Sequence, residues 1–355
     1  MTQTRAEVVL PTKNLSDDIP FWTKTLGFRM ETIFPADDPT TAVFSGHGLR
    51  LRLDATATGD PGTVCLLTDT PGDWPTTAPN GTRIETAPLT PLLVIPETDH
   101  AFTVRRLADE APWVIGRAGM QYRDLIPSRL GGSIIASHIR IPDGGPVPDM
   151  VHYHTVGFQL IYCLAGWVDL VYEDQGPPFR LHAGNCVIQP PEIRHRVLFA
   201  SDNIEVLEIG VPAVHLTTID HDMTLPNARV DRAREFQGQR FVHHKASEAT
   251  WAPHRLPGFT SRDTTIAANT NSTAGVHVIR KGQGAPQWTT HGGDILFTFV
   301  QSGTLTLEGD GQTTDLTAGD AFTIPPGLQT RYADPSDDLE LIEVALPAEV
   351  PTTIA

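Results

Sequence analysis

The first 70 residues combine short apolar runs with one helical stretch. Leu15, Ile19, Trp22 and Leu26 recur at helical spacing, so they lie on one face of a predicted helix. A strand-like run, EVVLPT, precedes this stretch, and three more, FRMETIF, TAVFS and LRLRLD, follow it. The pattern therefore predicts a small α+β module over residues 1–70 with the element order β-α-β-β-β.

A proline-rich segment follows this module. Residues 71–100 contain six prolines, a density that a central β-strand does not tolerate. We therefore expect a linker here.

The remaining chain contains an internal repeat of short alternating strands separated by Gly and Pro turns. FTVRRLADEAPW, which begins at Phe102, resembles FVHHKASEATW, which begins at Phe241. The stretch from Gly119 to Asp124 resembles that from Gly258. Glycine and proline positions further along repeat in the same way, and Glu208 matches Glu343. The two copies predict a pair of similar β domains.

This repeat sets the expected fold class and domain organisation. Short strands with frequent turns are typical of β-sandwiches and barrels. We expect a mainly β protein with one barrel over residues 101–212, a connector over 213–240 and a second barrel over 241–350. The two tandem barrels follow the small α+β module.

Composition narrows the range of partners. The chain has 26 Lys and Arg against 42 Asp and Glu, a formal charge of −16, which argues against nucleic acid and anionic membrane surfaces. Its three cysteines form no CxxC motif, and no apolar run is long enough for a signal peptide at the start or a membrane span elsewhere. We expect a cytoplasmic protein that acts on a small molecule.

The first copy carries a candidate metal site. His152 and His154 alternate along a predicted strand and so point to the same face. Gln159 follows a short turn whose geometry decides whether it shares that face, and only a barrel returns His195 to the pair. Imidazole suits Fe, Zn, Ni and Cu, and three neutral nitrogens leave coordination positions open. The histidine pair alone would also fit a polar strand that faces solvent.

The spacing of these residues resembles the two sequence motifs of the cupin superfamily. The matching positions are Gly145, His152, His154, Gln159 and Gly166 in the first motif and Gly184, Pro190 and His195 in the second. Gln159 stands where the family usually has Glu, which makes the ligand set neutral and favours an anionic ligand. Glu192 stands where it usually has Gly, which affects only a turn.

The resemblance implies two cupin barrels, each a double-stranded β-helix, with one divalent transition metal in the first. The implied ligands are His152, His154, Gln159 and His195. It favours Fe(II), with Zn, Ni or Mn as alternatives. Cupins often dimerise through edge strands, so we also expect a homodimer.

The N-terminal module resembles a second family. VVLPTKNLSDDIPFWTKTLGF, with the hairpin strands after it, resembles one βαβββ module of the glyoxalase/vicinal-oxygen-chelate superfamily. Active members pair two such modules around a metal, and Glu7 falls at a ligand position. Because only one module is visible, we expect a scaffold or dimerisation role rather than a second metal site.

The second copy tests the metal assignment from within the chain. Aligning Gly303 on Gly166 puts other residues at the four ligand positions: Thr289, His291, Leu296 and Thr330. One histidine does not hold a transition metal firmly. We therefore expect the second barrel to be metal-free.

Candidate substrate contacts follow from strand parity. Ile161 and Cys163 share the parity of Gln159, and Val197 and Phe199 share that of His195. These four side chains are therefore predicted to line a pocket. Side chains that only fill the core of the barrel would show the same pattern.

Two arginines are candidates for binding a substrate carboxylate or for structural ion pairs. Arg140 is retained as a pocket candidate. Arg123 has a counterpart, Arg262, in the metal-free copy, which favours a structural role. No catalytic residue stands out near the motif, because Glu192 is the only candidate base and its side chain need not face the pocket.

Three functions fit these residues. The resemblance favours an Fe(II) dioxygenase with a three-histidine site that acts on an enolisable or hydroxy-acid metabolite. The neutral Gln159 also fits a non-redox isomerase, lyase or cyclase that uses Zn, Ni or Mn to polarise a carbonyl. A small-molecule-binding barrel without catalysis is the third.

Overall fold

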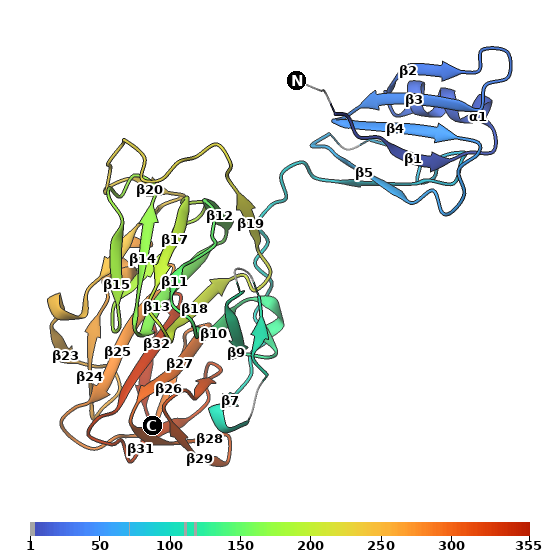
Figure 1. Ribbon diagram of the computed structural model, residues 1–355. Helices are drawn as coiled ribbons and strands as arrows, with labels where there is room; N and C mark the ends of the chain where they lie inside the picture. Colours follow the sequence, from blue (N-terminus) through green and yellow to red (C-terminus); the bar gives the residue numbers. More distant parts are fainter. Residues whose placement is uncertain (1–3, 71, 110–111, 117–118) are drawn as a thin grey trace. The chain divides into compact units, whose positions relative to one another are not determined.

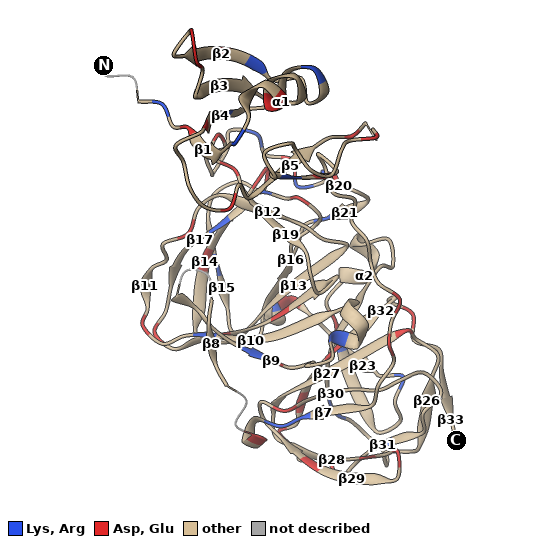
Figure 2. Ribbon diagram, turned by 90° about the vertical axis from the view of Figure 1, so that its right-hand side faces the viewer, with Lys and Arg blue, Asp and Glu red and all other residues tan. Residues whose placement is uncertain are grey.

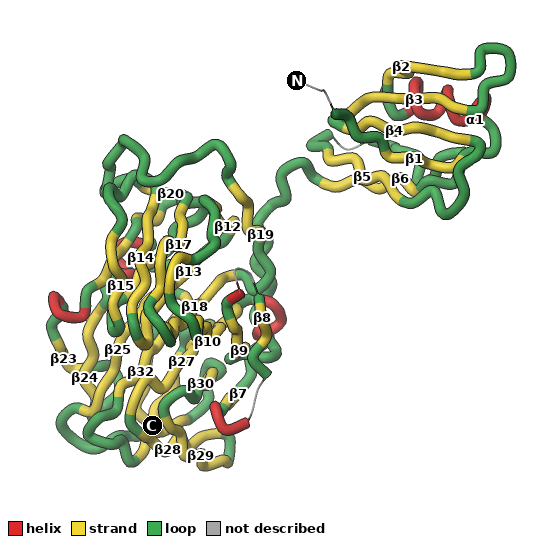
Figure 3. The backbone as a smooth tube through the Cα atoms, viewed as in Figure 1, coloured by secondary structure: helices red, strands yellow, loops and turns green. Residues whose placement is uncertain are grey.

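The structure is a computed structural model, and it divides into two compact units, Met1–Leu92 and Leu93–Ala355. It describes residues 4–70, 72–109, 112–116 and 119–355. Strands dominate both units and helices are few and short (Figures 1 and 3). The expected mainly β fold class is confirmed.

The first unit is built on a four-stranded sheet in the order β1-β4-β3-β2. Its strands are β1 (Val8–Pro11), β2 (Arg29–Phe34), β3 (Thr41–Gly46) and β4 (Leu49–Asp54). Helix α1 (Leu15–Pro20) and the π-helix η1 (Phe21–Thr25) connect β1 to β2, and the predicted helix residue Trp22 is fully buried. The predicted order β-α-β-β-β is present.

The segment predicted as a linker contributes a strand to this unit. β6 (Arg83–Ala87) pairs in parallel with β5 (Thr63–Leu67), and Ile84 is buried in the same core as Leu66. The first unit therefore extends to Leu92 rather than to residue 70. The prolines flank β6 instead of interrupting it, so proline density alone concealed a short strand.

The second unit contains the two copies, and their strands correspond along the chain. The first copy has β8 (Val114–Ile115), β9 (Gln121–Asp124), β10 (Ile135–Ile141), β11 (Gly145–Pro146), β12 (His152–Thr155), β13 (Phe158–Ala165), β14 (Trp167–Tyr172), β15 (Phe179–His182), β16 (Cys186–Ile188), β17 (His195–Ala200), β18 (Ile204–Val211) and β19 (Leu216–Ile219). The second has β23 (Trp251–Pro253), β24 (Phe259–Asp263), β25 (Gly275–Lys281), β26 (Thr289–His291), β27 (Ile295–Ser302), β28 (Thr304–Gly309), β29 (Gln312–Thr317), β30 (Ala321–Thr323), β31 (Thr330–Ala333), β32 (Glu340–Leu346) and β33 (Thr352–Ile354). A short hairpin of β20 (Glu235–Phe236) and β21 (Gln239–Arg240) lies between them.

Each of the two copies also contains short helical turns. They are η2 (Leu107–Asp109), η4 (Arg129–Gly132), η5 (Ala246–Glu248) and α2 (Ile266–Asn269). η4 and α2 occupy matching places, each between the second and third strands of its copy.

Each copy folds into two facing sheets. In the first barrel the orders are β22-β16-β13-β18-β10-β9-β8 and β15-β14-β17-β12-β19. In the second they are β23-β24-β25-β32-β27-β30-β7 and β29-β28-β31-β26-β33. Figure 2 shows β14 and β15 opposite β13 and β16, and β28 and β29 opposite β27 and β30. The internal repeat is thus a repeat of structure.

The two barrels exchange an edge strand. β22 (Val242–His244) precedes the second barrel in sequence but pairs with β16 of the first. β7 (Thr103–Arg105) precedes the first barrel but pairs with β30 of the second. The predicted boundaries at residues 101 and 241 therefore assign each of these strands to the wrong barrel. Sequence similarity shows that β7 and β22 are equivalent strands, but it does not show which sheet each strand joins.

The predicted end of each barrel is also too early. β19 lies in the segment predicted as a connector, yet it pairs with β12 along its whole length. β33 lies beyond residue 350 and pairs with β26 in the same way. Both strands are short and only partly apolar, so their alternation was too weak to detect.

Two buried arginines bind one barrel to the other. Arg123 donates to the backbone carbonyl of Gly319 in the second barrel. Its counterpart Arg262 donates to the carbonyl of Gly184 and to the hydroxyl of Tyr162 in the first, each at 2.9 Å. Both side chains are almost wholly buried. The structural role favoured for Arg123 is confirmed.

Within the described residues, no helix is both long enough and apolar enough to cross a membrane.

Candidate metal centre

Three histidines of the first barrel converge on one point. β12 carries His152 and His154, and β17 carries His195, whose backbone lies opposite His152 in the antiparallel register. One nitrogen from each ring can be chosen so that all three lie within 4.8 Å of one another, and all three side chains are buried. Strand alternation places the pair on one face, and the barrel brings the third residue back, as the sequence predicts.

Backbone contacts fix which ring nitrogen faces the centre. Nδ1 of His152 lies 2.7 Å from the carbonyl oxygen of Met150, and Nδ1 of His195 lies 2.9 Å from that of Ile193. A carbonyl only accepts hydrogen bonds, so Nδ1 carries the proton in both rings and the Nε2 lone pair can bind a cation. This arrangement is the one a metal-binding histidine needs.

Further side chains hold these ligands in place. Nδ1 of His154 lies 2.9 Å from the hydroxyl of Thr217 on β19. The buried carboxylate of Asp149 accepts from the backbone of Val197 at 2.9 Å and lies 3.6 Å from Nδ1 of His152. These outer contacts orient the rings and raise their basicity. Three convergent neutral imidazoles therefore fit a divalent transition metal.

Gln159 is buried on β13 and contacts Glu208, which lines the pocket. Its Nε2 donates to Oε1 of Glu208 at 2.8 Å, which fixes the amide orientation. Its Oε1 is buried with no hydrogen-bond partner among the described residues. An unpartnered amide oxygen is a suitable metal ligand, and the role of Gln159 as a fourth ligand stays a prediction.

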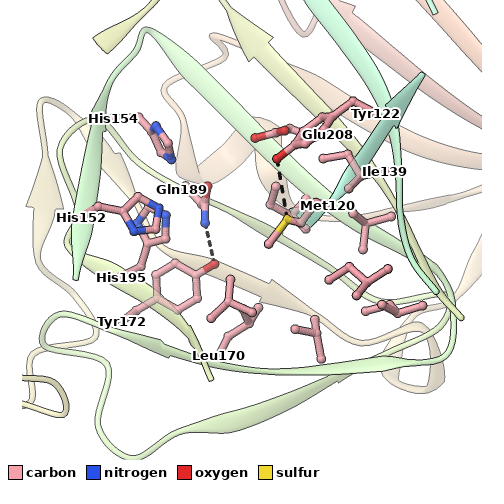
Figure 4. A pocket seen from close by; sticks show the side chains of 16 residues that line it. Met120, Tyr122, Ile139, His152, His154, Leu170, Tyr172, Gln189, His195 and Glu208 are labelled. Atoms are coloured by element: carbon pink, nitrogen blue, oxygen red, sulfur yellow. Dashed lines mark hydrogen bonds between the residues drawn. The ribbon is translucent and has the colours of Figure 1, made fainter. Parts of the chain in front are cut away.

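The histidines lie at one side of a pocket inside the first barrel (Figure 4). Most of the other lining side chains are apolar, and they include Met120, Ile139, Ile141, Ile161, Val168, Leu170, Val197, Ile204 and Val206. The polar lining side chains other than the histidines are Tyr122, Tyr172, Gln189 and Glu208. The predictions for Ile161 and Val197 agree with this lining.

Phe199 lies outside the pocket, contrary to prediction. It is 39% exposed and stacks on Trp167 at 5.9 Å between ring centroids. The register with β14 shifts between Val197 and Phe199, so one extra residue on β17 reverses the alternation. A β-bulge has this effect, and parity counted along the sequence cannot detect it.

Cys163 is not among the pocket-lining residues either. It is fully buried in the core of the first barrel, and its thiol lies 3.5 Å from the carbonyl oxygen of Ala165. Burial raises the pKa of this thiol to about 12, so it is protonated and unreactive near neutral pH. It shares this core with several pocket-lining residues but does not itself line the pocket.

Arg140 points away from the pocket. Its neighbours on β10, Ile139 and Ile141, line the pocket, so alternation places the guanidinium on the opposite face. There it lies 4.0 Å from the ring centroid of Trp113 and donates to Gln121 at 2.6 Å. The prediction of a substrate contact is wrong, and the role is structural.

Glu192 also lies outside the pocket, in the turn before β17. It has φ +63°, in the left-handed region, which explains why glycine suits this position. Its backbone amide donates to the carbonyl of His154 at 3.0 Å. In the second barrel the equivalent turn keeps a glycine, Gly327, with φ +78°.

The second barrel retains the geometry without the ligands. Thr289 and Thr330 lie opposite each other in the register that His152 and His195 occupy. Leu296 packs into the apolar core. The described residues contain one cluster of three potential metal ligands, and it lies in the first barrel.

In the first unit, Glu7 is engaged by two arginines. Its carboxylate accepts from Arg50 at 2.8 Å and from Arg52 at 2.6 Å. These contacts hold its pKa below the ordinary value. A carboxylate neutralised in this way fits the expected scaffold role better than a metal site.

Sequence reasoning missed the four polar residues that line the pocket besides the histidines, and Glu208 and Tyr172 are two of them. Glu208 matches Glu343 in the repeat, and it lies on β18 with its side chain in the pocket. Tyr172 stacks on His195 with 5.4 Å between ring centroids, and its hydroxyl accepts from Gln189 at 2.9 Å. Nothing in local sequence marks Tyr172, because its position depends on the pairing of β14 with β17.

Comparison with known proteins agrees with the duplicated fold. Residues 137–210 and 275–345 each match the family model of the cupin domain. The first match contains the three histidines and the second contains their replacements. No curated protein matches the chain.

Three solved structures with the same fold match more than two thirds of this chain. Salicylate 1,2-dioxygenase from Pseudoaminobacter salicylatoxidans, as a mutant, has TM-score 0.53 and 15% identity over 74% of this chain and 90% of its own. A mutant of Bacillus subtilis oxalate decarboxylase has TM-score 0.53 and 14% identity over 73% and 81%. Protein Ylba from E. coli has TM-score 0.51 and 13% identity over 71% and 93%. Both barrels therefore have the cupin-type fold.

Proposed function

We propose that this chain is a metal-dependent enzyme that acts on a small oxygenated metabolite, and that it is an Fe(II) dioxygenase. The substrate class is an enolisable or hydroxy-acid compound. The observation that carries the proposal is the convergence of His152, His154 and His195 at one side of a largely apolar pocket. The likeness to salicylate 1,2-dioxygenase supports it at the level of the fold.

The residues that line the pocket suggest a separate role for the metal, the apolar walls and Tyr172 in such an enzyme. When bound, a divalent metal supplies Lewis acidity, and iron also supplies oxygen chemistry. The three histidines would hold it through Nε2, and the aliphatic walls would exclude water and orient the apolar part of the substrate. The Tyr172 hydroxyl already accepts from Gln189, so its own proton can be donated to an oxygen atom of a ligand.

Oxygen consumption tests this proposal. Protein loaded anaerobically with Fe(II) is mixed with air-saturated buffer and a panel of 2-hydroxy acids, 1,3-dicarbonyl compounds and hydroxylated aromatic acids. We expect one class to drive stoichiometric oxygen uptake, and His152→Ala to abolish it. Turnover that proceeds equally without oxygen would contradict the dioxygenase assignment.

A non-redox reaction is the second candidate, and Glu208 favours it. Glu208 is the one carboxylate among the described lining residues, and Gln159 fixes its orientation. It can accept a proton from a carbon next to a metal-polarised carbonyl. Under this alternative, Zn-loaded or Ni-loaded protein turns over without oxygen, and Glu208→Gln lowers kcat far more than it raises KM.

A barrel that only binds its ligand would behave differently from both. Metal and ligand would bind with measurable affinity, and no member of the panel would be converted with any of the metals. Turnover measured with each metal, in the presence and absence of oxygen, therefore distinguishes the three functions.

A further inference from the structure

The second barrel contains a polar cavity of its own. Its volume is about 180 Å³, and it is lined by Pro253, His254, Arg255, Ser261, His277, Glu343, Ala348 and Val350. A cavity of ~150 Å³ holds benzene, so this one has room for a small organic molecule. It lies on the β24-β25-β32 side of the barrel, where Glu343 takes the place of Glu208 in the first.

An ion pair between Glu343 and Arg255 lines this cavity. Glu343 is fully buried, and its Oε2 accepts from Arg255 at 2.5 Å. The second guanidinium nitrogen of Arg255 donates to Thr352 on β33. The pKa of Glu343 falls to about 2, because the attraction of Arg255 and neighbouring histidines outweighs burial, which acts in the opposite direction. The pair is charged, and its net charge is zero.

Three buried polar atoms around this pair have no hydrogen-bond partner among the described residues. They are Oε1 of Glu343, Nε2 of His254 and Nδ1 of His277. His254 Nε2 lies 3.6 Å from Glu343 Oε1, which is within ion-pair distance but too long for a hydrogen bond. Buried groups of this kind are normally satisfied, so they indicate a ligand or ordered water.

The hydrogen-bonding roles of two of these atoms are fixed. The backbone amide of Leu256 donates to Nδ1 of His254, so the ring proton of the neutral form is on Nε2 and that atom is a donor. The Glu343 carboxylate is an acceptor only. The His254 side chain is 4% exposed, so both atoms are shielded from bulk water. The cavity thus presents a donor and an acceptor side by side.

We propose that the second barrel binds a small neutral molecule carrying a primary amide or ureido group. The carbonyl oxygen of such a group accepts from His254 and Arg255, and its N–H donates to Oε1 of Glu343. The apolar remainder of the molecule lies against Pro253, Ala348 and Val350. This site is separate from the metal centre and does not depend on the proposed reaction.

Charge explains why a carboxylate of the same shape is excluded. It would bring a second buried anion next to Glu343, and Arg255 is the only cation among the described lining residues. It also has no N–H to satisfy Oε1. Burying an unpaired charge is far less favourable than burying a hydrogen-bonded neutral group.

An isosteric pair of probes tests this site in the full chain. Propionamide and propionate are titrated against the protein, with ligand-detected NMR as the readout. We expect propionamide to bind at least about tenfold more tightly than propionate. In Glu343→Gln the carboxylate charge is lost and Arg255 remains uncompensated, so the preference should reverse towards propionate.

Two further variants secure the result. Ala348→Leu adds a larger side chain to the lining of the cavity and should abolish binding of propionamide. It carries the test alone if Glu343→Gln does not fold. His152→Ala should bind propionamide as the unaltered protein does, because that residue lies in the other barrel. Equal or tighter binding of propionate to the unaltered protein would overturn the proposal. So would the absence of saturable propionamide binding, or its survival in Ala348→Leu.

Discussion

The two barrels share one fold and differ in what they place inside it. Their strands correspond from β8 and β23 onward, except that β11 has no counterpart among the described strands of the second barrel. The same register that sets His152 opposite His195 sets Thr289 opposite Thr330. The first barrel presents three imidazoles, whereas the second presents two threonines and a histidine bonded to a backbone carbonyl. The fold therefore positions the ligand sites, and side-chain identity alone decides whether a metal can bind.

The second barrel nonetheless supports the first. Its leading strand β22 closes the sheet that contains β13 and β16, and Phe241 just before it packs on Tyr172 with 4.5 Å between ring centroids. Tyr172 in turn stacks on His195. The barrel without a three-histidine cluster thus holds one wall of the metal pocket in place.

The largest expected difference between the barrels is in metal binding. We expect His154→Ala to remove the metal, because two remaining histidines do not hold a divalent ion firmly. The matched change His291→Ala in the second barrel should leave the metal content unchanged. Metal content after dialysis, measured by inductively coupled plasma mass spectrometry, checks both. Equal loss in the two variants would contradict the assignment.

The arginines that join the barrels should contribute the next largest effect. Arg123→Met leaves the Gly319 carbonyl unsatisfied at a buried interface, so the free energy of unfolding should fall by about 2 kcal/mol. Arg262→Met should lower the free energy of unfolding by at least as much, because it also leaves the Tyr162 hydroxyl without its hydrogen-bond donor. Urea denaturation measures both.

The exposed pair between Arg240 and Glu235 gives a control for this prediction. Arg240→Met should change the free energy of unfolding by less than about 1 kcal/mol. Arg123→Met with no larger effect than Arg240→Met would show that the interface does not depend on the buried guanidinium.

The exchanged strands should differ in their response to pH. Burial lowers the pKa of His243 on β22 to about 4 from its usual 6.5. The folded protein holds this ring neutral, so its contribution to stability is present above pH 6.5 and is lost as the pH falls towards 4. The equivalent position on β7 is Val104, which does not titrate.

His243→Val should therefore flatten the stability profile between pH 6.5 and 4. The effect should be roughly 1 to 2 kcal/mol, because water still reaches part of the ring. Urea midpoints across this pH range measure it. An unchanged slope in His243→Val would show that His243 contributes no such pH dependence.

The turn before the last ligand gives the smallest expected effect. Glu192 holds a left-handed backbone that Gly327 holds in the second barrel. Glu192→Gly should raise the free energy of unfolding by up to about 1 kcal/mol, and Gly327→Ala, which meets no steric contact, should lower it by a similar amount. Thermal unfolding compares the two. Changes of the same sign would contradict this explanation.

These contrasts show which features local sequence can predict. The histidine spacing and the repeat were sufficient to place His152, His154 and His195 together, because strand alternation and duplication are regular. Phe199 was misplaced because a bulge in β17 reverses that alternation. A guanidinium suits a substrate carboxylate, but alternation along β10 turns Arg140 to the face opposite that of Ile139 and Ile141, which line the pocket.

Features that depend on pairing between distant strands were not predictable. The exchange of β7 and β22 leaves no local signal, and neither does the contact of Thr217 on β19 with His154. Glu208 could have been found, since its match to Glu343 fixes its strand and its parity with Val206 fixes its face. The resemblance of the first unit to a glyoxalase-type module stays a prediction, because no matched family segment covers it.

The most direct test of the central claim is a crystal structure of the metal-loaded protein with anomalous diffraction data collected at the edge of the bound metal. The account predicts one peak per chain, within bonding distance of Nε2 of His152, His154 and His195, and none at Thr289 and Thr330. A peak in the second barrel, or none at the three histidines, would contradict it.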